Sequence, residues 1–257
     1  MALKTIIFVR HGQSEYNKAM RETGEDPFIR DAPLTSKGLA QAREAQAELA
    51  ELQEACGADG WLLLSSPLRR ALDTAAGLWP KAFFGSEGRL EVWPELREVV
   101  TGCDDLGSTP QQLLETYPHL SEQLQSLPEI WWTVPHVYKD LPGDGDDMRL
   151  AYKRDPDAFE DADEAIFEQR LEVLLRKLSA VSEQKLVVVA HCDLIGHLTE
   201  KMGLKERKGC GFRKGWWLRN CECRLLQDFD FANYEMGCVS EEPSEEAFAT
   251  ACDCPAG

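Results

Sequence analysis

The sequence predicts an α/β fold with a mostly parallel central sheet flanked by helices on both faces. Apolar runs of strand length occur at residues 5–9, 61–64 and 185–190, and each is typical of a strand buried on both sides. Segments whose apolar residues recur at helical spacing lie between these runs. Because strands that alternate with helices form parallel sheets, the order of segments indicates one α/β domain. A length of 257 residues suits a single large domain, expected over residues 1–236.

Composition and charge exclude several classes of partner. The hydrophobic content of 43% indicates a folded chain, and the net charge of −17 argues against nucleic acid and anionic membranes as partners. Any phosphate site must therefore be locally basic. The apolar start of the chain is too short for a signal peptide, and the nine cysteines are odd in number and irregularly spaced. Reduced thiols and a cytoplasmic location are expected, and neither Cys221-x-Cys223 nor Cys252-x-Cys254 has the spacing of a zinc knuckle.

The first half of the chain contains three expected strands. The strand at 5–9 leads into Arg10-His11-Gly12, and residues 18–30 are expected to form a loop beside it. A helix capped by Thr35 or Ser36 should run to about Ala55. The strand at 61–64 ends in Ser65-Ser66-Pro67, where a second helix is expected to begin with Pro67 in its first turn. Residues 89–93 form the third, short strand.

The second half of the chain contains an expected insertion and the rest of the sheet. Ser108 or Thr109 caps a helix that ends by Tyr117. Residues 120–161 are rich in proline and carry Trp131, Trp132 and Tyr138, which predicts an inserted, lid-like segment; a plain surface excursion is the alternative. A long amphipathic helix over 162–182, a strand over 185–190 and a helix over 194–202 follow. Residues 215–220 and 222–231 are expected to pair as antiparallel strands at the sheet edge, and residues 237–257 to form an acidic, flexible tail.

The expected strand ends bring four basic side chains together. His11 follows the first strand, Arg70 follows the second, and His191 follows the strand at 185–190. In parallel sheets ligands bind beyond the carboxyl ends of the strands, so these groups should converge with Arg10 in one site. Arginine offers planar donors that suit phosphate oxygens, and histidine can act as a nucleophile. Arg69 lies about 100° from Arg70 around the helix and should face solvent.

The expected chemistry is phosphoryl transfer, which depends on positioning and charge stabilisation. Arg10 and Arg70 would hold the phosphoryl oxygens, and His11 would attack phosphorus and form a phosphohistidine. The other nitrogen of His11 should donate to a backbone carbonyl and so fix the tautomer. His191 would donate a hydrogen bond to the phosphoryl group, and a carboxyl group with a pKa raised by burial would protonate the leaving oxygen. Arginines and histidines supply the positive charge, so no metal and no cofactor are expected.

Four segments resemble the histidine phosphatase superfamily, also called the phosphoglycerate mutase-like family. The segments are Arg10-His11-Gly12 with Asn17; Pro33-Leu34-Thr35 with Gly38 and Gln41-Ala42; Ser66 to Ala75 with Arg70; and Val188-Val189-Ala190-His191. The resemblance implies a phosphohistidine at His11, phosphate contacts from Arg10, Arg70 and His191, and a supporting role for Asn17. It places the proton donor at Glu98 within Leu96-Arg97-Glu98, with Glu95 as a rival by proximity. Ser14, Thr23 and Gly24 fall in the family's phosphate-covering loop.

Two positions depart from the family pattern. Cys192 follows the second histidine, where a glycine or serine is common; its backbone N–H would still contact phosphate, and its thiol is expected to be an inert packed group. After Glu98 the chain reads Val99-Val100-Thr101-Gly102, whereas the mutases of the family continue Glu-Arg-x-Tyr-Gly. Arg149, Lys153 and Arg154 are possible substitutes for the arginines with which mutases bind the substrate carboxylate.

Three functions follow from this pattern. The favoured one is a metal-independent phosphomonoesterase acting through His11 on a small phosphorylated metabolite or a phosphoprotein. The alternatives are a cofactor-dependent phosphoglycerate mutase, which the spacing from Arg10 to Gly24 resembles, and a non-catalytic phosphate-binding scaffold. The scaffold would require a lost catalytic residue, and the sequence retains all of them. The sequence identifies neither the substrate nor the oligomeric state.

Overall fold

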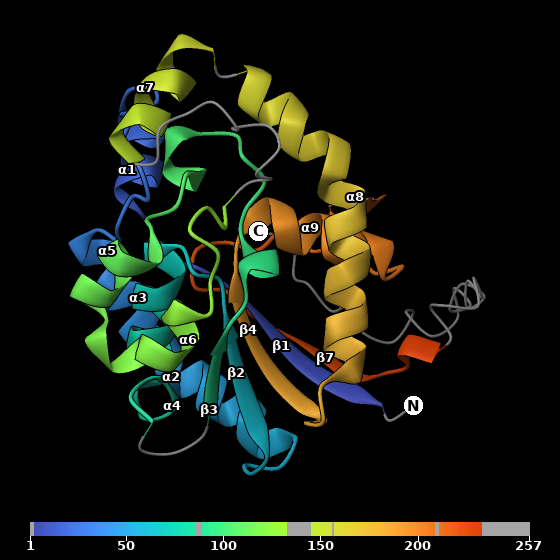
Figure 1. Cartoon of the computed structure of the whole chain (residues 1–257). Coiled ribbons are helices and arrows are strands. Elements are labelled where there is room, and N and C mark those ends of the chain that lie inside the picture. Colours follow the sequence, from blue (N-terminus) through green and yellow to red (C-terminus); the bar gives the residue numbers. More distant parts are fainter. Residues whose placement is uncertain (1–2, 86–88, 133–144, 156, 209–210, 233–257) are drawn as a thin grey trace, which may run out of the picture.

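A five-stranded sheet forms the centre of the computed structural model, which describes residues 3–85, 89–132, 145–155, 157–208 and 211–232 (Figure 1). The strand order is β3-β2-β4-β1-β7. The strands β1 (Lys4–Arg10), β2 (Trp61–Ser65), β3 (Arg89–Val92) and β4 (Lys185–Ala190) run parallel, and β7 (Cys223–Phe229) pairs antiparallel with β1. This arrangement confirms the predicted fold class.

The central strands are buried on both faces, as their apolar runs indicated. In β1, Ile7 and Val9 point to one face and Ile6 and Phe8 to the other, and all four side chains are fully buried. The register places Val9 beside Val189 of β4. The ends of β1 and β4 therefore lie side by side, and each leads directly into a histidine.

One face of the sheet carries the helices of the first half of the chain. These are α2 (Ser36–Ala55), α3 (Arg69–Leu78), α4 (Pro80–Phe83), α5 (Pro110–Thr116) and α6 (Ser121–Gln125). Thr35 caps α2 and Thr109 caps α5, both as the sequence indicated. Trp131 and Trp132 are buried in the same core, so the chain at residues 131–132 packs against this face of the domain. Short 3-10 turns cover Pro94–Leu96, Cys103–Asp105 and Pro118–Leu120.

The helices α8 (Asp157–Ala180) and α9 (Cys192–Lys201) cover the opposite face (Figure 1). Leu171, Leu174, Leu175 and Leu178 form the buried side of α8. The helix α7 (Gly145–Arg154) packs against the turn at 101–105, where the hydroxyl of Tyr152 donates to the carbonyl of Thr101 at 3.2 Å. None of the helices in the described ranges has both the length and the apolar character needed to cross a membrane.

Three sequence-based expectations were wrong. Residues 18–30 are not a continuous loop, because α1 (Glu15–Glu22) begins at a capping box in which Ser14 and Asn17 exchange hydrogen bonds. Pro67 precedes α3 rather than lying in its first turn. Residues 215–220 form no strand: β5 (Lys205–Lys208) pairs instead with β6 (Gly211–Lys214), and the chain turns at Gly215, whose φ is +69°. On the β1 side, β7 is therefore the edge strand of the sheet, and β3 forms the opposite edge.

Some expectations concern residues outside the described ranges. Tyr138 belongs to the undescribed residues 133–144, and the predicted tail at 237–257 falls in the undescribed residues 233–257. The lid-like role of the insertion therefore stays a prediction, supported only by the position of α7.

Candidate active site

The candidate active site lies at the carboxyl ends of β1, β2 and β4. The chain leaves β1 and β2 toward α2 and α3 on one face of the sheet, whereas it leaves β4 toward α9 on the other. Neighbouring strands whose connections run to opposite faces leave a crevice between them, and ligands bind there in α/β proteins. The sequence prediction that these strand ends meet is confirmed, because the rings of His11 and His191 have centroids 5.1 Å apart.

His11 is held in the orientation that a nucleophile requires. Its Nδ1 donates to the carbonyl of Gly12 at 2.7 Å, which leaves the lone pair on Nε2. This hydrogen bond to a backbone carbonyl was predicted and is confirmed. Gly12 and Gly38 allow the loop to approach the start of α2 closely, since a Cβ on Gly12 would lie 2.7 Å from the Gly38 carbonyl oxygen and a Cβ on Gly38 only 2.2 Å from that of Gln13.

His191 directly follows β4, at the N-cap of α9, and is completely buried. Its Nε2 lies 2.8 Å from the hydroxyl of Ser66, at the end of β2. Its Nδ1 is buried and has no partner within the described part of the chain. Since a buried polar atom without a partner costs about 1–3 kcal/mol, this nitrogen points to a ligand that completes its hydrogen bonding.

Arg10 and Arg70 supply the positive charge around the two histidines. Arg10 donates through Nη1 to the carbonyl of Leu218 at 3.0 Å, and the guanidinium of Arg70 is buried. Burial lowers the pKa of both His11 and His191 well below the usual value, and Arg70 and Arg10 lower it further. Both imidazoles are therefore neutral at neutral pH. A nucleophilic histidine must be neutral, because the attacking nitrogen needs its lone pair.

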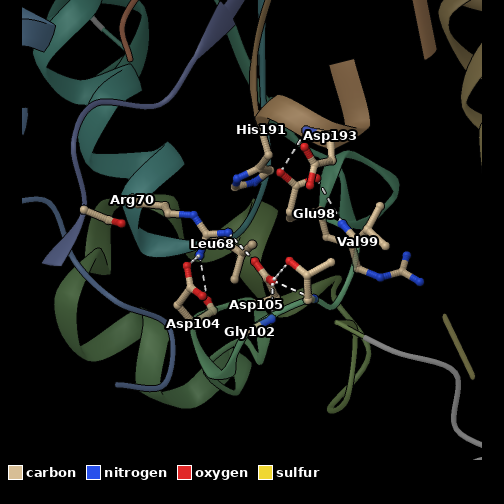
Figure 2. Close-up of polar contacts among 12 residues, drawn as sticks. Leu68, Arg70, Glu98, Val99, Gly102, Asp104, Asp105, His191 and Asp193 are labelled. Atoms are coloured by element: carbon tan, nitrogen blue, oxygen red, sulfur yellow. Dashed lines mark hydrogen bonds and ion pairs between the residues drawn. The ribbon is translucent and has the colours of Figure 1, made fainter. Parts of the chain in front are cut away.

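Two buried carboxyl groups that the sequence analysis missed hold Arg70 (Figure 2). Its Nη1 donates to the carbonyl of Asp104 at 2.6 Å and lies 3.2 Å from the Asp104 carboxylate, while its Nη2 donates to Asp105 Oδ1 at 2.6 Å. The other oxygen of Asp105 accepts from the backbone N–H groups of Thr101 and Gly102. Asp105 therefore links Arg70 to the turn that follows Glu98. Two adjacent acids after a glycine were the available sequence signal.

Glu98 lies beneath the first turn of α9, next to His191 (Figure 2). Its Oε1 accepts from the N–H of Leu194 at 2.8 Å and of Val99 at 3.0 Å, and its Oε2 accepts from the N–H of Asp193 at 3.1 Å. Burial, together with Asp193 and Asp105, raises the pKa of Glu98 to about 7, although the N–H of Leu194 opposes the shift. Glu95 instead forms an ion pair with Lys177 of α8 at 2.7 Å.

The other predicted residues differ in how close they lie to His11. Ser14 and Asn17 are joined in the capping box, and Asn220, which the sequence analysis did not single out, links Asn17 Oδ1 to the carbonyl of His11. Thr23 and Gly24 are exposed at the far end of α1, roughly 14 Å along the helix from Ser14, and the Thr23 hydroxyl donates to the carbonyl of Ala19.

Cys192 is the first residue of α9, where a helix presents free N–H groups. Its Sγ lies 3.7 Å from the carbonyl of Leu218, and burial raises the pKa of the thiol. The side chain is therefore a protonated, packed thiol. In the described ranges, no group of three or more potential ligands could hold a metal ion.

Comparison with known proteins assigns the family. The chain belongs to the histidine phosphatase superfamily, because the model of its branch 1 matches residues 6–211, which include His11, Arg70, Glu98 and His191. A glucosyl-3-phosphoglycerate phosphatase of Mycolicibacterium vanbaalenii is 40% identical over 78 residues, which is 30% of this chain and 30% of that protein. The match thus spans less than a third of that relative's length.

A solved structure shows the same fold. The crystal structure of phosphoglycerate mutase from Bacillus anthracis is 20% identical to this chain, covers 91% of it and 96% of its own chain, and superimposes with a TM-score of 0.50. At this identity the likeness concerns the fold alone. Family membership and fold are therefore established, and the predicted roles of the individual side chains remain to be tested.

Proposed function

We propose that this chain is a phosphatase that hydrolyses phosphate monoesters through a phosphohistidine on His11. The observation that carries the proposal is the pair of neutral histidines near Arg10 and Arg70, with ring centroids 5.1 Å apart, a free Nε2 lone pair on His11 and a buried, unpartnered Nδ1 on His191. A phosphoryl group between the rings would meet a nucleophile on one side and hydrogen-bond donors around its oxygens.

The first step transfers the phosphoryl group to the enzyme. His11 Nε2 forms a bond to phosphorus while the bond to the ester oxygen breaks, and Glu98 gives its proton to that oxygen so that an alcohol leaves. Glu98 Oε1 already accepts two backbone N–H groups, whereas Oε2 accepts one. Oε2 is therefore the better place for the proton, and a pKa of about 7 keeps it available near neutral pH.

The second step returns the enzyme to its starting state. The Glu98 carboxylate takes a proton from water, the water oxygen bonds to phosphorus, and the bond to Nε2 breaks. Inorganic phosphate leaves, and Glu98 is protonated again. Arg10 and Arg70 neutralise the phosphoryl oxygens in both steps, so we propose that the reaction requires no metal ion.

A phosphoglycerate mutase would return the phosphoryl group to a second substrate instead of to water. The spacing from Arg10 to Gly24 favours this alternative, but the residues after Glu98 differ from the mutase pattern and Asp104 and Asp105 lie beside Arg70. Buried acids next to the phosphate site disfavour a substrate that carries its own carboxylate. We therefore propose hydrolysis of a small phosphorylated metabolite or a phosphoprotein, and do not assign the named substrate of the mycobacterial relative, whose match covers only 78 residues.

The test is a hydrolysis screen over phosphorylated metabolites and phosphopeptides in the presence of EDTA, with the wild-type chain and His11→Ala. We expect phosphate release only from the wild type, and an acid-labile phosphoenzyme that is absent from the variant. His197→Ala is the matched control, because His197 lies exposed on α9. Phosphate trapped on another residue, or full activity of His11→Ala, contradicts the proposal; transfer to a second substrate faster than to water would identify a mutase.

A further inference from the structure

Ser66 is a fully buried serine that the proposed mechanism leaves without a role. It directly follows β2, and its N–H donates to the carbonyl of Val189 in the neighbouring strand β4 at 3.0 Å. Val189 is two residues before His191, so this hydrogen bond fixes Ser66 beside the end of β4 and close to His191. The Ser66 hydroxyl lies 2.8 Å from His191 Nε2 and accepts the N–H of Leu68 at 3.3 Å.

We propose that Ser66 is a positioning residue that sets the tautomer of His191: its hydroxyl donates to Nε2, so that the ring proton stands on Nδ1 and faces the phosphoryl group. The inference rests on the proposed function, because a phosphoryl oxygen is the acceptor that Nδ1–H would meet. It concerns a hydrogen bond only and requires no group beyond those present in the chain.

The hydrogen bonds of Ser66 decide between the two tautomers. A hydroxyl has one proton and two lone pairs, and one lone pair accepts the N–H of Leu68. If the hydroxyl proton goes to His191 Nε2, every group of this cluster except Nδ1–H has a partner. If Nε2 instead donated to Ser66, the hydroxyl proton would be buried without an acceptor among the described residues, and Nδ1 would carry a buried, unpartnered lone pair.

The proposed tautomer is also the one that suits an anion. A lone pair on Nδ1 would repel the phosphoryl oxygens, whereas an N–H donates to them. His191 is neutral because of its burial and the nearby arginines, so it has only one ring proton to place. The position of that proton decides whether His191 assists or opposes the binding of phosphate.

Nuclear magnetic resonance of the full chain tests the tautomer directly. In long-range ¹H–¹⁵N spectra of the protein labelled at histidine nitrogen, protonated and unprotonated ring nitrogens are distinguished, and the signals of His191 are assigned by their loss in His191→Gln. We expect a protonated Nδ1 and an unprotonated Nε2, with a shift of the Nδ1–H signal when inorganic phosphate is added. A protonated Nε2 in the wild type overturns the inference.

Ser66→Ala tests the consequence for phosphate binding. We expect the inhibition constant of inorganic phosphate to rise and kcat/KM for p-nitrophenyl phosphate to fall, each about 10- to 100-fold, the range for losing a hydrogen bond to a charged group. Ser65→Ala is the matched control, since this equally buried neighbour donates to the carbonyl of Ser66 and, among the described residues, its side chain has no hydrogen bond to a histidine. Unchanged phosphate inhibition in a folded Ser66→Ala overturns the inference.

The two proposals fail in different ways. If the wild type hydrolyses no phosphate ester but His191 carries its proton on Nδ1, the proposed function fails and the tautomer assignment stands. If the wild type is an active phosphatase with the proton on Nε2, the proposed function stands and the role of Ser66 is wrong. If Ser66→Ala does not fold, the spectrum of the wild type alone decides the tautomer.

Discussion

Arg69 and Arg70 are adjacent in the sequence but occupy different environments. Arg70 is buried and forms hydrogen bonds with Asp104 and Asp105, whereas Arg69 is only half-buried at the surface of α3. We predict that Arg70→Lys lowers kcat about 10²- to 10³-fold, the range for removing one group that stabilises charge in the transition state. A lysine keeps the charge but not the planar guanidinium, which contacts Asp104 and Asp105 and, in the proposed mechanism, would also contact the phosphoryl group.

Arg69→Lys is the control for this prediction and should change kcat little. The measurement is steady-state hydrolysis of one substrate by both variants, with circular dichroism to check that each is folded. Equal losses in the two variants would show that the difference in burial does not decide the role of these arginines.

Glu98 and Glu95 form a second matched pair. Glu98→Gln should slow the hydrolysis of alkyl phosphates much more than that of aryl phosphates, because an alkoxide needs a proton to leave and a phenolate does not. General acid catalysis contributes about 10²- to 10⁴-fold, so the loss for alkyl phosphates should approach that range. Glu95→Gln should be mild, since the Glu95 carboxylate is already paired with Lys177 of α8. The measurement is kcat/KM for both substrate types; an equal loss for both would indicate that Glu98 only positions α9.

The pKa of Glu98 also predicts the pH dependence of the same reaction. Because the donor must be protonated and burial raises its pKa to about 7, kcat/KM for alkyl phosphates should fall as the pH rises through about 7. For aryl phosphates the fall of kcat/KM with pH should be weaker. In Glu98→Gln the fall near pH 7, the alkaline limb of the pH profile, should disappear. A limb that survives unchanged in Glu98→Gln belongs to another group.

At the scale of elements, the sequence predicted helices and strands correctly where the capping residues and the apolar periodicity of a segment agreed. The helix α2 was placed correctly because Thr35 caps it and its apolar stripe is regular. The helix α1 was missed because its residues are mostly polar and none is buried, its start is marked only by the Ser14–Asn17 capping box, and nearby Gly24 and Pro27 indicated a loop. The strand expected at residues 215–220 is absent: Trp216 is partly buried against the core, and its N–H donates to the Thr199 hydroxyl of α9 instead of extending the sheet.

In the candidate site too, some residues could be predicted from local sequence patterns and others could not. His11, Arg70 and His191 could be predicted because each follows a strand whose apolar run is evident in the sequence. The contacts of Asp104, Asp105, Ser66 and Asn220 could not be predicted, because they depend on how turns meet in space: Arg70 and Asp105 are 35 residues apart, and Ser66 and His191 are 125 apart. Proximity between such turns is set by the packing of the sheet and helices and leaves no periodic signal.

The contact between the loop after β1 and the start of α2 carries a prediction of its own. A Cβ on Gly38 would lie 2.2 Å from the Gln13 carbonyl oxygen, so Gly38→Ala must move α2 or the loop that holds His11. We expect a lower melting temperature together with a loss of kcat. Gly77→Ala is the control: the atom nearest to its Cβ would be the Ala42 Cβ, at 2.8 Å between α3 and α2, so the substitution should lower the melting temperature with a much smaller change in kcat. A Gly38→Ala variant with normal kcat would show that His11 tolerates displacement of this contact.

For the whole molecule, charge is distributed unevenly. The chain carries a net charge of −17, yet its candidate site presents Arg10 and Arg70 around two neutral histidines. Under the proposed function, these arginines would attract a phosphate dianion at contact distance, whereas the overall charge would repel it during approach. These two effects separate with ionic strength, because salt shortens the Debye length from about 30 Å at 0.01 M to about 8 Å at 0.15 M and so screens long-range repulsion far more than buried contacts.

We therefore predict that kcat/KM rises with ionic strength between about 0.01 and 0.15 M, since screening removes repulsion during the approach of substrate. Removing residues 237–257 tests the cause, because this segment carries five acidic residues and no basic ones: Glu241, Glu242, Glu245, Glu246 and Asp253. It lies beyond both β7 and the family match, so its removal should leave the site intact. The shortened chain should be faster than the full chain at low salt and equal to it at high salt. Comparing the two chains in the same buffer cancels competition by the salt anion, and an equal salt response in both would place the effect at the site itself.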